Sequence, residues 1–357
     1  AGGDRLVWDF FETGATLTYA DLKPRVDALA AGLMSIGVGK GTHVAVMLPN
    51  TPSFPLTWLA LGTLGAVMVP VNNSYTEREI AYVVNDSEAE FLVVDDGCIE
   101  PVRRLLARGE IKIAPGCIVV AGGHASGSGG HRLLADLMRA DPAGLRVDWD
   151  VGHGDLLNIQ YTSGTTGFPK GCMLTQRYWV SAGKVNAFRD GRRYRRILAP
   201  TPFYYMDPQW LLLMALYQRA TLYVAQRQSA SRFMGWVRDH DIEFCLLPAL
   251  ILKQPADPRD ADNKVIRANI YGVSGIAQKA IEERYDLNAR EAFGMTEVGP
   301  AMFMPIEATD TVGSQSCGVP CPFRECRIAD EHGNSVSAGT VGELLIRGPG
   351  ILLGYYN

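Results

Sequence analysis

The chain has 357 residues, of which 47% are hydrophobic and 20% charged, an ordinary globular composition with enough apolar material for more than one core. Its formal net charge of -4 gives no excess of Lys and Arg to attract nucleic acid or anionic lipid, so we expect neither as a partner. The sequence has no run of about 18 apolar residues, so we expect no integral membrane segment and a cytoplasmic protein.

The first part of the chain alternates predicted helices and strands. Apolar residues recur at helical spacing from Tyr19 to Ile36, and Gly37 ends the pattern. The following predicted elements are a strand at 43–48, a helix at 54–64, a strand at 66–71, a helix at 77–84 and a strand at 91–95. Regular alternation of this kind predicts a largely parallel, doubly wound sheet, and hence an α/β fold.

A second series of strands and helices covers residues 156–290, after a glycine-rich segment at 122–130 that predicts a surface loop. Shorter strands at 324–328 and 341–346, separated by turn-forming residues, predict a small antiparallel or barrel-like unit. The expected units are a first α/β subdomain interleaved with the next (1–160), a second α/β subdomain with the nucleotide site (161–304) and an incomplete β-barrel subdomain (305–357).

A loop rich in hydroxyl groups and glycines follows one of these strands and ends at a single lysine, Lys170. Glycines allow backbone N–H groups to turn toward an anion, hydroxyls donate further hydrogen bonds, and the lysine adds a positive charge. A Walker A loop would need its lysine directly after the second glycine, whereas Phe168 and Pro169 intervene here. The residues predicted to bind polyphosphate are Thr162, Ser163, Gly164, Thr165, Thr166, Gly167 and Lys170.

A second candidate segment runs from Phe293 to Glu297 and contains an aromatic ring, a glycine, a hydroxyl and a carboxylate. A lone carboxylate completed by phosphate oxygens and water is a common way to hold Mg²⁺, so Glu297 is the predicted metal ligand. A single Thr-Glu pair is also typical of a helix cap, and its combination with the loop at 162–171 favours the nucleotide site.

The segment 162–171 (TSGTTGFPKG) resembles the signature of the AMP-forming adenylating superfamily, which includes acyl-CoA synthetases, adenylation domains of non-ribosomal peptide synthetases and firefly-type luciferases. Further segments match this family in the same order, at 17–22, 64–72, 292–297 and 342–355. The resemblance implies two interleaved doubly wound, flavodoxin-like subdomains, a small β-barrel subdomain and a mobile C-terminal α+β domain. That last domain, with the ribose-binding aspartate, the hinge and the adenylation lysine, is expected to lie beyond Asn357.

Similarity to the family also suggests roles for single residues. Thr296 would lie near the α-phosphate and Phe293 beside the adenine, Gly294 would allow the nucleotide to approach closely, and Lys170, Thr296 and Glu297 would carry catalysis. The family's Gly-rich adenine loop corresponds to residues 271–276 (YGVSGI), which lack its proline and form a shorter loop, and Gly272 and Ser274 are the candidate adenine contacts.

We expect the segment 202–209 (PFYYMDPQ) to border the acyl pocket, because many relatives place a histidine or an aromatic residue there. Tyr205 stands there, either as a pocket wall with one polar tip or as a core tyrosine whose hydroxyl is satisfied. This segment and the shortened adenine loop most resemble the crotonobetaine/carnitine-CoA ligase branch. The basic run 189–196 is interpreted as a solvated turn and not as a phosphate or CoA site.

The resemblance implies ATP-dependent activation of a carboxylic acid to its acyl-AMP with release of pyrophosphate, followed by thioester formation with CoA. Expected small molecules are therefore ATP, Mg²⁺, CoA and a carboxylic acid whose identity the sequence does not give. Two alternatives stay open, an adenylation module that loads a carrier protein and a catalytically silent nucleotide-binding scaffold. The sequence also leaves a homodimer open.

Overall fold

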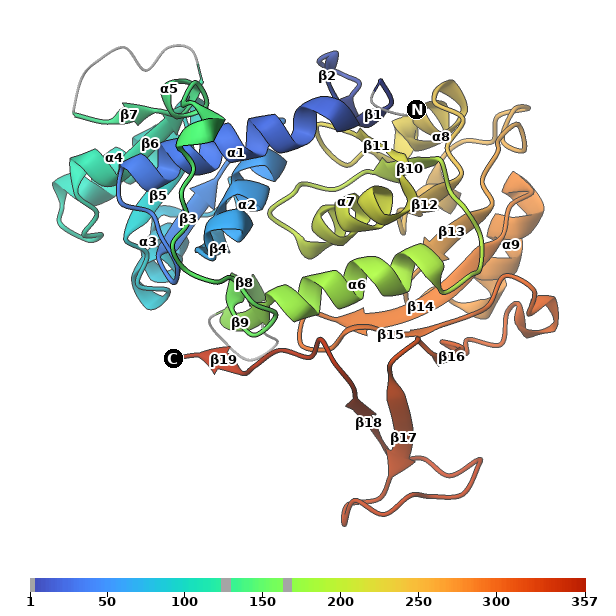
Figure 1. Ribbon diagram of the computed structural model, residues 1–357. Coiled ribbons are helices and arrows are strands. Elements are labelled where there is room, and N and C mark those ends of the chain that lie inside the picture. The colour runs from blue at the N-terminus through green and yellow to red at the C-terminus, as the bar shows by residue number, and fades with distance from the viewer. Residues whose placement is uncertain (1–3, 123–129, 163–168) are drawn as a thin grey trace.

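The computed structural model describes residues 4–122, 130–162 and 169–357. Figure 1 shows two sheets side by side, both covered by helices, and a narrow ribbon that projects from the body near the end of the chain. The helices are α1 (Tyr19–Ser35), α2 (Ser53–Leu64), α3 (Glu77–Asp86), α4 (Ile99–Ala107), α5 (Leu134–Leu137), α6 (Gln176–Phe188), α7 (Met206–Gln218), α8 (Ala230–Asp239) and α9 (Gly275–Tyr285).

The first sheet has the strand order β19-β9-β8-β4-β3-β5-β6-β7. Its pairs from β8 to β7 are parallel, whereas β9 is antiparallel to both β8 and β19. The strands are β3 (His43–Met47), β4 (Val67–Pro70), β5 (Phe91–Asp95), β6 (Ile118–Ala121), β7 (Arg132–Leu133), β8 (Leu156–Thr162), β9 (Lys170–Thr175) and β19 (Tyr355–Tyr356).

The second sheet has the strand order β16-β15-β14-β13-β12-β10-β11-β1-β2, and its central pairs from β14 to β1 are parallel. Strands from the start of the chain form one edge, because β1 pairs with β11 as well as with β2. The strands are β1 (Leu6–Phe10), β2 (Ala15–Thr18), β10 (Arg196–Ala199), β11 (Thr221–Val224), β12 (Phe244–Leu246), β13 (Arg267–Ile270), β14 (Ala289–Met295), β15 (Gly299–Phe303) and β16 (Val319–Pro320).

Neighbouring side chains along the strands face different cores, as the period of two requires. In β3, Val44 joins a core with α1 and α2, whereas Ala45 joins a core with α3 and α4. In β10, Ile197 faces the first of these cores together with α6 and α7, and Leu198 faces α8 and α9. The layers are therefore α3 and α4, the first sheet, a central layer of α1, α2, α6 and α7, the second sheet, and α8 and α9 (Figure 1).

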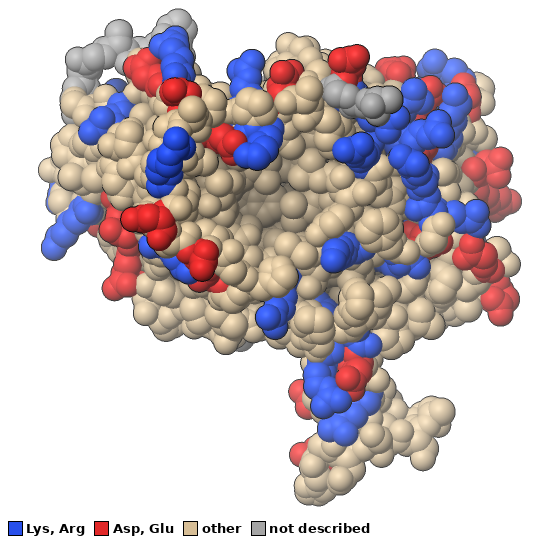
Figure 2. All heavy atoms as spheres, viewed as in Figure 1, with Lys and Arg blue, Asp and Glu red and all other residues tan. Residues whose placement is uncertain are grey.

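These layers confirm the predicted α/β class with largely parallel sheets covered on both faces. Residues 305–357 do not close into the expected barrel: β17 (Glu325–Ala329) and β18 (Glu343–Arg347) form a two-stranded antiparallel ribbon, and β19 pairs with β9 instead. Figure 2 shows that this ribbon projects into solvent and carries charges of both signs, among them the ion pair of Arg347 with Glu325.

Two expectations concern other parts of the chain. The glycine-rich loop at 122–130 falls mostly outside the described residues, which omit 123–129. Within the described ranges, none of the helices combines the length and the apolar character that crossing a membrane requires.

Candidate active site

The predicted phosphate loop connects two antiparallel strands at the edge of the first sheet. Thr162 is the last residue of β8, and it pairs with Lys170, the first residue of β9. The intervening candidates Ser163, Gly164, Thr165, Thr166 and Gly167 lie outside the described residues. Because β8 is parallel to β4, the loop lies at the carboxyl end of a parallel strand, where open α/β sheets bind their ligands.

The second candidate segment forms the end of β14 and the turn into β15. Gly294 pairs with Pro300 and Met295 with Gly299, so Thr296 and Glu297 lie in the tight connection between the strands. A Cβ atom at Gly294 would lie 2.7 Å from the carbonyl oxygen of Gly299, closer than side chains and backbone approach each other. The hairpin therefore requires glycine at this position.

Tyr355 brings the two candidate segments together. Its hydroxyl donates a hydrogen bond to Oε1 of Glu297 at 2.9 Å, and Nζ of Lys170 lies 5.0 Å from the centre of its ring. β19 carries Tyr355 into this position by pairing with β9, opposite Cys172. The hydrogen bond to the Glu297 carboxylate raises the pKa of Tyr355 to about 12, because it stabilises the protonated hydroxyl.

A buried arginine fixes the turn against the late segment of the chain. Nη2 of Arg324 donates to the carbonyl oxygens of Val298 at 2.9 Å and Gly350 at 3.1 Å, and Nη1 donates to that of Pro349. The backbone N–H of Leu352 also donates to the carbonyl oxygen of Glu297 at 2.9 Å. Burial lowers the pKa of Arg324, and its carbonyl partners offset part of the cost of placing this charge in the interior.

The predicted adenine contacts follow the carboxyl end of β13. Gly272 has φ +63° and donates its backbone N–H to Oε1 of Glu291, whose pKa is raised by burial and lowered in part by this bond. Ser274 begins α9, where its hydroxyl accepts the N–H of Ala277 at 3.3 Å. The structure thus brings both residues to the same sheet edge as Phe293, with the hydroxyl of Ser274 used as a helix cap.

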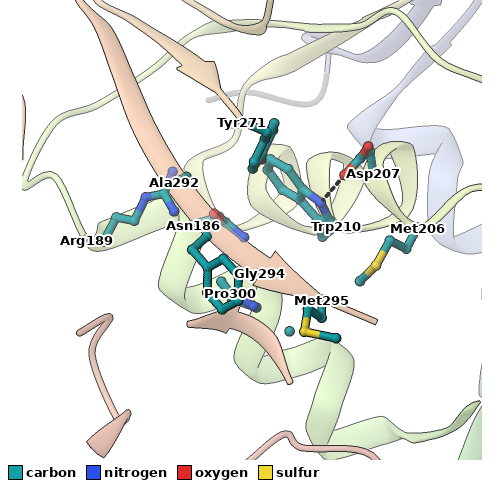
Figure 3. Close-up of a pocket in the computed structure, with 12 residues that line it drawn as sticks. Asn186, Arg189, Met206, Asp207, Trp210, Tyr271, Ala292, Gly294, Met295 and Pro300 are labelled. Carbon is teal, nitrogen blue, oxygen red and sulfur yellow. Dashed lines mark hydrogen bonds between the residues drawn. The ribbon is translucent and has the colours of Figure 1, made fainter. Parts of the chain in front are cut away.

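A pocket lies between the central helices α6 and α7 and the strands β14 and β15, and it holds about 450 Å³ of space including solvent at its mouth (Figure 3). Met206 lines it and accepts a hydrogen bond at Sδ from Oγ1 of Thr296, so the pocket adjoins the candidate catalytic turn. Its lining residues are Asn186, Arg189, Met206, Asp207, Trp210, Tyr271, Ala292, Phe293, Gly294, Met295, Gly299 and Pro300.

Tyr205 is not among the residues that line this pocket. It is 49% exposed, precedes the first turn of α7 and packs its ring 4.7 Å from that of Tyr204. Asp207 and Trp210, which line the pocket from the start of α7, were not predicted from the sequence. Arg189 also lines the pocket, although it was interpreted as part of a solvated run. The spacing of three between Asp207 and Trp210 was an available signal, because such residues share one face of a helix.

Comparison with known proteins gives a consistent result. The family model described as AMP-binding enzyme matches residues 2–356. 4-Coumarate–CoA ligase 5 from Oryza sativa is 30% identical over 367 residues, which cover 97% of this chain and 65% of the rice protein. Crotonobetaine/carnitine–CoA ligase from Citrobacter koseri is 28% identical, with 93% of this chain and 65% of the relative covered. The chain thus spans about two thirds of the length of these relatives.

Solved structures support the same fold. The luciferase-like enzyme from the nonluminescent Zophobas morio mealworm superposes with a TM-score of 0.87 at 18% identity, over 99% of this chain and 84% of that one. A long-chain-fatty-acid-CoA ligase from Archaeoglobus fulgidus gives a TM-score of 0.86 at 23% identity, over 99% of this chain and 74% of that one. At these identities the likeness concerns the fold.

Proposed function

Because the chain belongs to the AMP-binding enzyme family, we propose that it provides the nucleotide and acid sites of an ATP-dependent ligase. This ligase activates a carboxylic acid as its acyl-AMP, releases pyrophosphate and then forms a thioester with CoA. The contacts of Tyr355 with both Lys170 and Glu297 support this function most directly, since they bring a cation and a carboxylate together at the phosphate loop.

The proposed chemistry needs no covalent nucleophile from the protein. A carboxylate oxygen of the substrate attacks the α-phosphorus of ATP, and the bond from that phosphorus to the pyrophosphate oxygen breaks. Lys170 would neutralise charge on the phosphates, and the hydroxyl of Thr296 would donate to the α-phosphate. Fixed groups of this kind lower the barrier because they need little rearrangement when charge develops.

Mg²⁺ is part of the proposal, with Glu297 as its protein ligand. Among the described residues, no group of three or more His, Cys, Asp or Glu side chains is placed to hold a metal ion. One carboxylate beside a triphosphate fits a nucleotide-bound Mg²⁺, which usually keeps several waters and one or two carboxylate ligands. When bound, the ion would neutralise phosphate charge during the displacement.

CoA is the preferred acceptor because similar proteins, such as those from Oryza sativa and Citrobacter koseri, are named as CoA ligases. The free thiol of CoA would attack the acyl carbon of the adenylate, and AMP would leave. A carrier protein with a phosphopantetheine arm presents the same thiol, so an acceptor assay that supplies either CoA or such a carrier distinguishes the two.

The decisive experiment is a panel of carboxylic acids scored by ATP-dependent pyrophosphate release with the full-length protein. Lys170→Ala should lower the rate by about two orders of magnitude, as expected for losing a charge that stabilises the transition state. Lys184→Ala is a matched control, because Lys184 is an exposed lysine on α6. Nucleotide binding without pyrophosphate release for any acid would instead identify a silent scaffold.

A further inference from the structure

We propose that a second nucleotide site, separate from the catalytic one, lies where the C-terminal ends of α6 and α7 meet, and that it binds a nucleoside diphosphate or triphosphate. Its arginines would hold the phosphates, and an exposed phenylalanine would stack on the base. The pocket holds about 720 Å³ of space including solvent at its mouth. Its lining residues are Phe188, Gly191, Arg192, Arg193, Tyr217, Gln218 and Arg219.

This pocket lies at the end of the second sheet opposite to the catalytic site. Phe188 ends α6 and Arg196 begins β10, so the connection that carries the pocket residues leads into the amino end of a parallel strand. The candidate adenine residues instead follow the carboxyl end of β13, which runs in the same direction as β10. The length of the strands therefore separates this pocket from the adenylating groups, and the site is independent of the proposed function.

The arginines at this pocket carry more positive charge than the acids around them offset. Arg192 pairs with Glu307 at 2.7 Å, but both side chains are mostly exposed, so water screens the pair. Within the described ranges, neither Arg193 nor Arg219 takes part in an ion pair. Arg5 adds a further guanidinium, whose Nη1 donates to the carbonyl oxygen of Arg219 at 2.9 Å. Several clustered positive charges favour a polyanion as the ligand.

The fold gathers this charge from segments that are distant in the sequence. The run at 189–196 alone is typical of a solvated turn, whereas the structure adds Arg219 from the end of α7 to the same pocket. Figure 2 shows Lys and Arg side chains gathered at the upper right of the molecule, over the connection between α6 and β10. Guanidinium groups bind phosphate oxygens through pairs of N–H donors, so this cluster is suited to a di- or triphosphate.

The backbone around the pocket is held in place by the buried side chain of Gln218. Its Oε1 accepts the backbone N–H of Tyr194, and its Nε2 donates to the carbonyl oxygens of Ala187 and Arg192. Gly191, with φ +62°, makes the turn between these contacts. A connection that is fixed in this way loses little conformational entropy when a ligand binds.

Two aromatic rings form the apolar side of the pocket. Phe188 is 57% exposed and Tyr217 is 37% exposed, and their ring centres lie 6.1 Å apart in an edge-on arrangement. The contact with Tyr217 supports the Phe188 ring while more than half of that side chain stays open to solvent. A nucleobase gains binding energy by stacking on such a ring, and neighbouring guanidinium groups add to it. Exposed ring and clustered arginines together match a nucleotide.

A solvated surface without a ligand is the alternative. Arginines that follow helix C-termini offset the helix dipoles, and single exposed aromatic residues are common. Each dipole corresponds to about half a charge, so the ends of two helices offset about one of the three arginines that line the pocket. This alternative predicts weak binding of any anion without a contribution from the base, whereas a nucleotide site requires both.

The test measures the binding of ADP to the full-length protein by equilibrium dialysis. Pyrophosphate, which lacks the base, and CoA, which carries a nucleotide diphosphate within a larger molecule, are separate probes. Arg193→Gln/Arg219→Gln removes two charges, and Phe188→Leu removes the ring but keeps an apolar side chain. Arg25→Gln/Arg227→Gln is the matched control, because both arginines are exposed and neither lines the pocket.

At an ADP concentration that saturates the parent, Arg193→Gln/Arg219→Gln should bind one ADP fewer per chain, because its affinity at this site falls by about 100-fold. Its free energy of unfolding in urea and its KM for ATP in pyrophosphate release should stay unchanged. Phe188→Leu should weaken ADP binding at this site by about tenfold and leave pyrophosphate binding unchanged. The control variant should bind as much ADP as the parent. Displacement of this ADP by CoA would identify the nucleotide end of CoA as the ligand, and its retention would identify a free nucleotide.

Three results would overturn this assignment. One is an equal number of bound ADP molecules in the parent and in Arg193→Gln/Arg219→Gln. Another is a loss of bound ADP that is matched by a higher KM for ATP, since the lost site would then be the catalytic one. The third is an equal effect of Phe188→Leu on ADP and pyrophosphate, which would leave only a site for anions without a base.

Discussion

Replacing Gly294 by alanine tests whether the β14–β15 hairpin positions the catalytic turn. The added Cβ would lie 2.7 Å from the carbonyl oxygen of Gly299, whereas carbon and oxygen without a conventional hydrogen bond normally approach to about 3.4 Å. The carbonyl must therefore recede by roughly 0.7 Å, and because Gly299 pairs with Met295, the connection that holds Thr296 and Glu297 moves with it.

Two consequences of different size are expected from this displacement. Extra volume in a packed site typically costs about 1–3 kcal/mol, so Gly294→Ala should lower the free energy of unfolding by that amount. A misplacement of about 1 Å at a catalytic site can cost about 100-fold in rate, so a shift of roughly 0.7 Å should lower kcat/KM for pyrophosphate release by about 10- to 100-fold.

The same substitution elsewhere in the chain provides the control. Gly235 lies inside α8, and a Cβ added there would meet nothing within 4 Å. Gly235→Ala should therefore raise the free energy of unfolding by about 0.5–1 kcal/mol, because alanine is the better helix former, and leave activity unchanged. Urea unfolding and pyrophosphate release are measured for both variants. If Gly294→Ala adenylated at the parental rate, the hairpin could not be what positions the turn.

Three further outcomes can be checked with the same assays. Glu297→Gln should keep the fold but lose most adenylation, because a neutral amide holds Mg²⁺ poorly. Near-normal turnover of this variant at limiting Mg²⁺ would contradict the assignment of Glu297 as the metal ligand. Tyr355→Phe should lower adenylation about 3- to 10-fold with little change in stability, because it removes one exposed hydrogen bond to Glu297. Tyr356→Phe is the control: it loses a hydrogen bond to Glu88, away from the site, and should leave adenylation unchanged. Asp190→Asn should lower the free energy of unfolding in urea by about 3–5 kcal/mol, because the buried guanidinium of Arg267 loses the carboxylate that lies 2.9 Å away. A loss below about 1 kcal/mol would show that other groups compensate the charge of Arg267.

The alternating elements of the first 100 residues could be predicted because each buries its apolar face locally. The predicted strand at 91–95 coincides with β5, and the predicted helix at 54–64 differs from α2 by one residue. The hairpin of β1 and β2 was missed. Its position depends on Trp8 pairing with Leu222, more than two hundred residues away in the sequence, and such non-local pairing leaves no periodic signal.

The barrel expected at 305–357 was predicted from short strands alone. Closing a barrel requires every strand to find partners on both sides. In the part of the chain that the structure describes, β17 and β18 form a sheet of two strands, and the last strand pairs with β9 in the first sheet. A pattern of strands gives their number and length, but the partner of each strand depends on the rest of the fold.

The candidate site was predictable where the chemistry is concentrated in one segment. The family assignment made from the loop at 162–171 and the segment at 292–297 is confirmed by the family model, while the roles of Lys170, Thr296 and Glu297 remain predictions. In the segment 202–209 an aromatic residue was chosen as the pocket wall. Helix α7 begins immediately after Tyr205, so the face that lines the pocket starts at Met206 and continues through Asp207 to Trp210.

Tyr355 shows why the late segment of the chain belongs to the site and not only to the ribbon beside it. Residues 349–355 are held by the buried Arg324, by the bond from Leu352 to Glu297 and by pairing with β9. These contacts connect the edge of the first sheet to the β14–β15 turn of the second. Lys170 lies on β9 of the first sheet and Glu297 in the β14–β15 turn of the second, so the distance between them depends on how the two sheets are joined. Within residues 349–355 the side chain that packs against a hydrophobic core is that of Leu352, whereas Tyr355 is exposed. Changes at Tyr355 should therefore alter adenylation more than the packing of either sheet.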